Sequence, residues 1–180
     1  MSGFFFMRRF DGCPVEVRLL ENIASSLEFR GPDGAQAWTK GPIGGCFTWM
    51  RTGPPPQSKI QPVTLDERFR LWGDVRLYAQ EELRKELAEH DPVTNAGATS
   101  EELLLQSWKT WGPASLEKVI GDFSFVLWDA REEIAWCARD FVGPRPFNYS
   151  AAENVFCCSN TLDVLQLLPE LLTRSLRSRN

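Results

Sequence analysis

The stretch Gly121–Asp129, which reads GDFSFVLWD, decides how this chain is expected to fold. Its aromatic and aliphatic residues predict a strand over 122–129. The polar residues 130–133 form the expected turn, and a second strand is expected over 134–139. Residues 147–149 and 155–159 predict another hairpin. This half of the chain therefore predicts antiparallel strand pairs.

The remaining elements are found by working outward from these hairpins. Strands are expected where aromatic or alternating apolar residues occur, over 3–9, 37–39, 44–51 and 68–78. Helices are expected where apolar residues recur every three or four positions, over 14–27, 81–88, 100–111 and 162–172, with a short helix ending at Val119 and an interruption at Pro169. Hairpins with helices grouped between them predict an α+β fold.

The composition sets limits on the class of partner. Twenty Lys and Arg residues stand against 24 Asp and Glu, so the net charge is -4. Nucleic acid and anionic membranes both require a basic face, so neither is expected as a partner. No apolar run approaches the ~20 residues of a membrane span. Residues 1–7 are too short for the apolar core of a signal peptide, so we expect a cytoplasmic protein.

The cysteine and histidine content favours neither a metal site nor a thiol catalyst. Five cysteines are scattered through the chain without a C-x-x-C pair, and they are Cys13, Cys46, Cys137, Cys157 and Cys158. They are expected to be small buried side chains in a reducing compartment. His90 is the single histidine, at an expected helix end. We therefore expect no metal and no cofactor.

Two long motifs, in the right order, carry a family resemblance. Residues 121–129 and the run ARDFVGPRPFNY at 138–149 resemble G-D-F-A-F-A-L-W-D and A-R-D-x-x-G-x-K-P-L-Y-Y. These patterns are typical of the amino-terminal class II glutamine amidotransferase domain of asparagine synthetases. RGPDG at 30–34, QP at 61–62 and SNTL at 159–162 match further family motifs. The resemblance covers nearly the whole chain.

The resemblance implies an Ntn-hydrolase fold, a four-layer sandwich with two stacked antiparallel β-sheets between helix layers. It implies an amidotransferase-like domain over residues 1–168 and a carboxyl-terminal tail over 169–180. In the family, a cysteine exposed by removal of the initiator Met attacks glutamine, its own α-amine acts as base, and ammonia passes to an ATP-dependent synthetase domain. No S-G-G-x-D-S or Walker-type loop occurs in this chain, so the synthetase domain is expected to be absent.

This chain departs from the family at the positions that handle glutamine. Ser2 stands where the family has the cysteine nucleophile. Either Thr48 or Trp49 occupies the position of the arginine that binds the substrate carboxylate, and Arg51 is a candidate substitute on the same strand face. The family's N-G-E reads WGD at 72–74, so Gly73 and the acid Asp74 remain while Trp72 replaces an oxyanion-hole asparagine.

The last departure concerns the acid that holds the substrate amino group in the family's S-D motif. The motif falls near Thr99–Ser100, which leaves Glu101 as the candidate acid. Since charged substrates need charged partners, these changes together predict a degenerate glutaminase. The pattern resembles the nucleophile-lacking β-lactam and lasso-peptide macrolactam synthetases, so the chain is expected to bind a synthetase domain or subunit.

An alternative remains open, because an amino-terminal serine can act as a nucleophile when an amine serves as its base. In this alternative the chain is an active Ntn amidohydrolase. Ser2 attacks an amide other than that of glutamine, and Trp49 and Trp72 line a more apolar pocket. The sequence predicts no particular oligomeric state.

Overall fold

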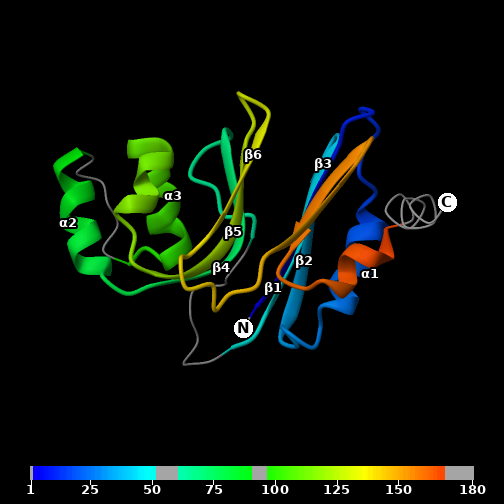
Figure 1. Cartoon of the computed structure of the whole chain (residues 1–180), viewed down its shortest axis with the longest axis horizontal. Coiled ribbons are helices and arrows are strands. Elements are labelled where there is room, and N and C mark those ends of the chain that lie inside the picture. The colour runs from blue at the N-terminus through cyan, green and yellow to red at the C-terminus, as the bar shows by residue number, and fades with distance from the viewer. Residues whose placement is uncertain (1, 52–60, 91–96, 169–180) are drawn as a thin grey trace. The chain divides into compact units, whose positions relative to one another are not determined.

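The computed structural model describes residues 2–51, 61–90 and 97–168. They form two compact units. The first unit takes residues from both ends of the chain, up to Pro62 and again from Pro146, and the second unit spans Val63–Arg145. Each unit contains one sheet (Figure 1).

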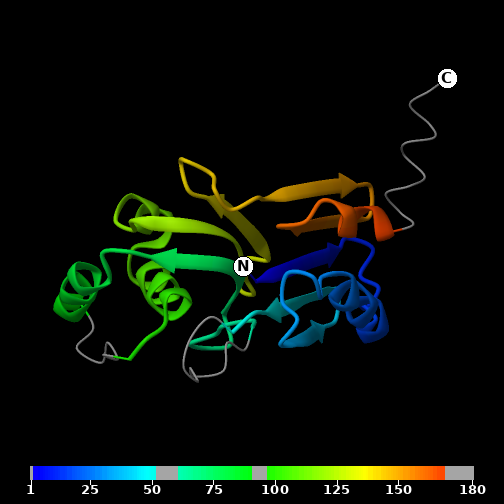
Figure 2. The same ribbon diagram turned by 90° about the horizontal axis from the view of Figure 1, so that it is seen from below.

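The first unit is a five-stranded antiparallel sheet in the order β2-β3-β1-β8-β7. Its strands are β1 (Gly3–Arg9), β2 (Gly34–Lys40), β3 (Ile43–Trp49), β7 (Asn148–Ala152) and β8 (Val155–Ser159). The first strand of the chain therefore pairs with its last strand. Helix α1 (Val17–Ser26) lies along β2 and β3, as Figures 1 and 2 show from two directions.

The core of this unit follows from the alternation of β1. Phe5 and Met7 point to the same face and pack with Leu20 and Ile23 of α1. The helix begins at Val17, three residues later than expected from the apolar spacing. Val15 explains the delay, because its backbone N–H donates to the Gly41 carbonyl at 2.9 Å and keeps the chain at the β2–β3 turn.

The second unit is a three-stranded antiparallel sheet in the order β4-β5-β6. Its elements are β4 (Phe69–Leu77), α2 (Gln80–His90), α3 (Ser100–Trp111), the short 3-10 helix η1 (Gly112–Glu117), β5 (Gly121–Asp129) and β6 (Ile134–Arg139). Helix α3 begins with a capping box, in which Thr99 and Glu102 satisfy each other's backbone N–H groups. Leu103 and Leu104 of α3 belong to the same buried core as Leu71 and Phe125 of the sheet.

Most expected elements are present within one to three residues of their predicted ends, and the α+β class is confirmed. The expected helix over 162–172 is instead the single 3-10 turn η2 (Asp163–Leu167). Leu168 has extended backbone angles, as is usual before a proline, and residues 169–180 lie outside the described chain. Among the described residues, no helix is long and apolar enough to span a membrane.

The RGPDG segment is fastened to the end of β3. Asp33 donates its backbone N–H to the Trp49 carbonyl at 3.1 Å, and its carboxylate accepts from the Arg51 amide. Gly31 lies so close to β3 that a Cβ there would come within 2.3 Å of the Thr48 carbonyl carbon and the Trp49 nitrogen. A side chain at this position would therefore push the segment off the strand.

We expect Gly31→Ala to lower the free energy of unfolding by about 3 kcal/mol, because both atoms it would meet are backbone. Gly41→Ala is the control. Gly41 has open space around it, and its φ of 58° makes alanine cost only about 1 kcal/mol. Urea unfolding of both variants measures the difference, and equal losses would contradict the close approach.

An ion pair closes the far end of the β4–β5 ladder. Arg68 donates to Asp129 from Nη2 at 2.7 Å and from Nε at 3.0 Å. The backbone amides of Arg131 and Glu132 also donate to this carboxylate. Burial acts to raise the pKa of Asp129, but the hydrogen bonds from Arg68 and the two amides outweigh it and hold the pKa below the ordinary 3.8.

A carboxylate with a lowered pKa stabilises the folded state above its ordinary pKa, and this stabilisation is lost as the pH falls through the lower folded value. We therefore expect Asp129→Asn to be less stable than the wild type at pH 5–7 and the gap to narrow below about pH 4. Urea unfolding at several pH values tests this. A gap that does not change with pH would contradict it. Glu132→Gln, an exposed neighbour, is the control.

Candidate functional site

Ser2 is fixed by the side chain of a residue near the other end of the chain. Its carbonyl accepts from Asn160 Nδ2 at 2.7 Å, and Asn160 Oδ1 accepts from the Phe4 backbone N–H at 3.1 Å. Ser2 is 6% exposed and Asn160 1%. The amide of Asn160 thus replaces a strand partner beside β1 and holds the main chain at the nucleophile position.

A second layer of hydrogen bonds supports this arrangement. Ser159 Oγ donates to the Phe4 carbonyl at 2.6 Å and accepts from the Thr161 N–H at 3.0 Å. Thr161 Oγ1 in turn accepts from Arg30 Nε at 2.6 Å. The sequence analysis matched SNTL to a family motif but assigned no role to Asn160. The sequence did carry a signal, because the polar run at 159–161 directly follows an apolar strand, and buried polar groups need hydrogen-bond partners.

The three residues expected near the substrate carboxylate do not share one environment. Thr48 is fully buried and its hydroxyl donates to the Leu27 carbonyl at 3.2 Å, so this side chain is turned toward the end of α1. Trp49 stacks on Phe47 with ring centroids 6.5 Å apart and covers Gly34. Strand β3 ends at Trp49, so strand alternation does not extend to Arg51, which is exposed.

The WGD segment lies on β4 of the second unit. Trp72 is fully buried, and Gly73 pairs with Phe125, where a Cβ would come within 2.5 Å of the Phe125 Cβ. Asp74 forms an ion pair with Arg145. The two side chains are only 11% and 14% exposed. Asp74, the acid retained from the family's N-G-E, therefore already has a cationic partner.

Ser100 and Glu101 begin α3. Ser100 Oγ accepts from the Leu77 backbone N–H and from Gln80 Nε2, both at 3.2 Å. This hydroxyl thus joins the end of β4 to the starts of α2 and α3. Glu101 is 4% exposed. The structure brings Ser100 to the end of the strand that carries Trp72, Gly73 and Asp74.

The expected site residues are divided between the two units. Ser2, Trp49 and Arg51 belong to the first unit, whereas the WGD segment and the start of α3 belong to the second. In the first unit, Gly3 pairs with Thr48, so Ser2 and Trp49 occupy neighbouring strand ends. In the second unit, one strand and one helix start carry all the expected residues.

Other nucleophiles and ligands do not replace the missing cysteine. Cys46 is buried, and that burial raises the pKa of its thiol to about 12, which keeps it protonated at neutral pH. Among the described residues, no three His, Cys, Asp or Glu side chains lie together in a way that could hold a metal ion.

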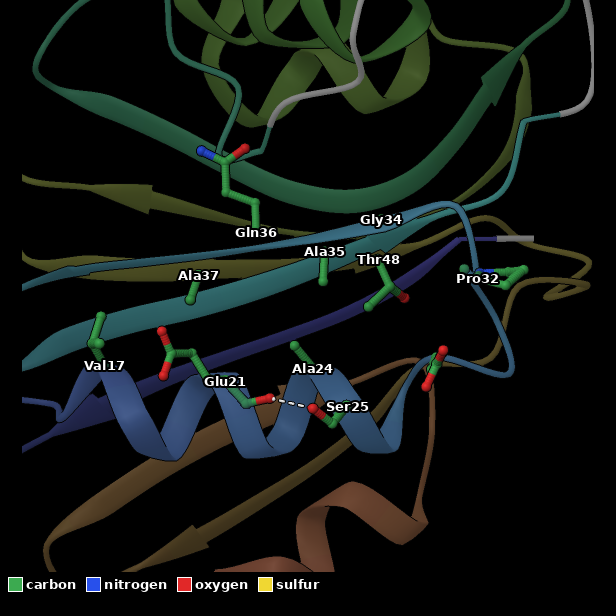
Figure 3. Close-up of a pocket in the computed structure, with 12 residues that line it drawn as sticks. Val17, Glu21, Ala24, Ser25, Pro32, Gly34, Ala35, Gln36, Ala37 and Thr48 are labelled. Carbon is green, nitrogen blue, oxygen red and sulfur yellow. Dashed lines mark hydrogen bonds between the residues drawn. The ribbon is translucent and has the colours of Figure 1, made fainter.

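A cavity of about 500 Å³ lies between α1 and β2 in the first unit (Figure 3). Its walls are mostly small side chains, including Ala24, Ala35 and Ala37, with Glu21 along the helix. Ser25 Oγ donates to the Glu21 carbonyl at 3.0 Å beside it. Thr48, one of the two residues expected at the substrate carboxylate, lines this cavity, whereas Ser2 and Trp49 do not.

Residues 1–176 match the family model described as a glutamine amidotransferase domain. The chain belongs to this family. The match agrees with the motif resemblance and includes both units of the structure. The amidotransferase domain is thus identified by its whole length and not by a single motif.

Two relatives and one solved structure show the range of similar proteins. Asparagine synthetase [glutamine-hydrolyzing] 3 of Bacillus subtilis is 24% identical over 88% of this chain and 26% of its own length. Amidase chyE of Penicillium rubens is 27% identical over 58% of this chain and 16% of its own length. The chain thus spans about a quarter or less of these relatives.

The solved structure is the glutamine phosphoribosylpyrophosphate amidotransferase from B. subtilis, complexed with ADP and GMP. It matches 91% of this chain and 43% of its own with a TM-score of 0.67 and 16% identity. At this identity the likeness shows the fold alone. The expected Ntn-hydrolase fold is confirmed at this level.

We expect Asn160→Ala to lower the free energy of unfolding by about 2 kcal/mol, because it leaves a buried N–H and a buried carbonyl unpaired. It should also speed hydrogen exchange at the Phe4 amide. Asn148→Ala is the control, since the Asn148 side chain makes one long bond of 3.5 Å to the Ser159 carbonyl. Unfolding and amide exchange measure both effects, and unchanged exchange at Phe4 would contradict the role of Asn160.

Proposed function

We propose that this glutamine amidotransferase domain no longer hydrolyses glutamine. It acts as a structural or partner-binding module of an ATP-dependent amide-forming system, of the asparagine synthetase or lasso-peptide macrolactam synthetase kind. The family match and the relatives support the amidotransferase part of this proposal. The loss of activity is inferred from the site residues of this chain.

The replacement of the family's cysteine nucleophile by Ser2 carries the proposal, and the charges of the expected pocket are described beside it. Glutamine binds as a zwitterion, so its ammonium group needs an uncompensated carboxylate in a buried pocket. In this chain the guanidinium of Arg145 already neutralises Asp74 where both side chains are almost buried. Arg145 stands where the family pattern has lysine, so the position keeps its charge. Asp74 and Arg145 thus keep a pair of charges that the family pattern also has, and Glu101, the candidate acid for the substrate ammonium group, is 4% exposed.

The other altered positions act in the same direction. Ser2 provides a hydroxyl, which ionises far less readily than a thiol. Trp72 has no carboxamide donor for an oxyanion and is fully buried. Loss of one such donor typically costs about 100-fold or more in rate. Nucleophile, oxyanion stabilisation and substrate charge recognition are thus all weakened together.

A synthetase partner follows from the size of the relatives. This chain spans 26% of the B. subtilis asparagine synthetase. In such a relative, an amidotransferase region is joined to a much longer remainder. We infer that the present domain binds a protein that supplies ATP-dependent carboxylate activation, either as part of the same polypeptide or as a separate subunit.

A second function is favoured by one observation, the fixation of Ser2 by Asn160. A serine that no longer reacts would not need a buried backbone held by two hydrogen bonds from Asn160, at the Ser2 carbonyl and at the Phe4 N–H. In this second candidate Ser2 is the nucleophile of an active amidohydrolase, its α-amine is the base, and the substrate is an amide other than that of glutamine. The similarity to a fungal amidase supports this candidate.

The decisive experiment measures glutamate release from glutamine by wild type, Ser2→Ala and Ser2→Cys, after intact mass confirms removal of Met1. We expect no release from any of the three proteins, because the pocket has lost more than its nucleophile. Thermal unfolding controls for the fold. Release by Ser2→Cys alone would show that the pocket survives. Release by the wild type that Ser2→Ala abolishes would establish the second candidate.

A further inference from the structure

The cavity between α1 and β2 carries negative charge. Glu21 of α1 and Glu28, which follows the end of this helix, both line it and both are exposed. Within the described chain, neither side chain forms an ion pair or a hydrogen bond. None of the described residues that line the cavity is Arg, Lys or His. Arg18 and Arg30 are close in sequence but do not line it, and Arg30 donates to Thr161.

Small side chains keep this cavity open. Ala35 and Ala37 alternate toward α1, whereas Gln36 points away from it (Figure 3). Strand β2 is the outer strand of its sheet, with β3 as its single strand partner among the described residues. Proteins usually cover or guard such an edge. The volume of about 500 Å³ lies within the roughly 300–1,000 Å³ of ligand sites. The cavity therefore has room for side chains of a further segment.

The end of this chain has the opposite charge. Residues 169–180 read PELLTRSLRSRN. From position 173 onward they contain three arginines and no acidic side chain. Leu176 stands between the first two arginines and adds an apolar side chain. The segment 173–180 thus combines the charge and the apolar character that the cavity would accept.

This segment also starts close to the cavity. Leu168 is fully buried and belongs to the same core as Leu20 and Ile23 of α1. An extended chain advances about 3.3 Å per residue, so Arg174 can lie up to about 20 Å from Leu168. A helix with its side chains is only about 10 Å across. The basic residues can therefore reach the cavity side of α1.

We propose that residues 173–180 dock in the cavity between α1 and β2. Their arginine side chains pair with Glu21 and Glu28, and Leu176 packs against the alanine side chains. Each exposed ion pair is weak, so the contact depends on several pairs acting together with the apolar contact. The inference goes beyond the proposed function, because it concerns a contact of the chain with itself and does not depend on glutamine chemistry.

Zero-length crosslinking in the full chain tests this contact. Arg174→Lys, Arg177→Lys and Arg179→Lys, made one at a time, keep the charge and add an amine that a carbodiimide can join to a carboxylate in contact with it. We expect mass spectrometry to find this amine joined to Glu21 or Glu28. Glu82 and Glu89 of α2 are the matched control, because they are also exposed and also seven positions apart. We expect no crosslink to this control pair.

The other outcomes overturn the inference in distinguishable ways. A mixture of ordinary and ¹⁵N-labelled chains shows whether a crosslink joins one chain or two. Crosslinks between two chains would mean that a second copy supplies the segment. Equal crosslinking to Glu82 and Glu89 would mean contact without a site. No crosslink to Glu21 or Glu28 in any of the three variants would remove the docking site.

Trypsin cleavage at the arginines of 173–180 tests the charge. We expect Glu21→Gln combined with Glu28→Gln to raise the cleavage rate at least about threefold at low salt, because both opposite charges are removed. Glu82→Gln combined with Glu89→Gln should leave the rate nearly unchanged. At 1 M salt, where the screening length is about 3 Å, the difference should disappear. Circular dichroism confirms that the variants are folded, and equal rates at low salt would overturn the pairing.

Discussion

The pairing of β1 with β3 on one side and β8 on the other puts the first residues of the chain in the middle of a sheet. This constraint fixes everything near the amino terminus. Phe5 and Met7 must face the core beneath α1, and Ser2 must lie at a buried strand end. Asn160 completes the ladder where the backbone of β8 stops. An amino-terminal residue is thereby held as firmly as a residue of the core.

The second unit shows how charge is distributed in an amidotransferase domain whose site has changed. Arg145 neutralises Asp74 and Arg68 neutralises Asp129, so these buried carboxylates have partners within the unit. Arg139 lies with Asp122 and Asp140 around a surface cavity, beside exposed apolar side chains. The internal pairs satisfy the charges of carboxylates that lie almost buried in this unit.

Much of the architecture could be predicted from the sequence, because hairpins and helix starts depend on neighbouring residues. The GDFSFVLWD hairpin and the helix over 100–111 are local patterns, and both are confirmed, although the helix cap is Thr99 and not Ser100. The same local reasoning was wrong where a segment distant in sequence forms a hydrogen bond with the predicted element. It placed residues 14–16 in a helix, although a hydrogen bond from Val15 to Gly41 holds them outside it. It also extended a strand to Arg51, whose amide is bound by Asp33.

The sequence by itself determined the family, the α+β class and the exchange of cysteine for Ser2, because these depend only on residue order and motif spacing. The tertiary structure decided which partners the site residues contact. Asp74 meets Arg145 across 71 positions, and Ser2 meets Asn160 across 158. No local pattern links residues so far apart. The physical reason is that strand pairing brings them together only after the sheets have formed, and only then do their charges and hydrogen-bonding groups find partners.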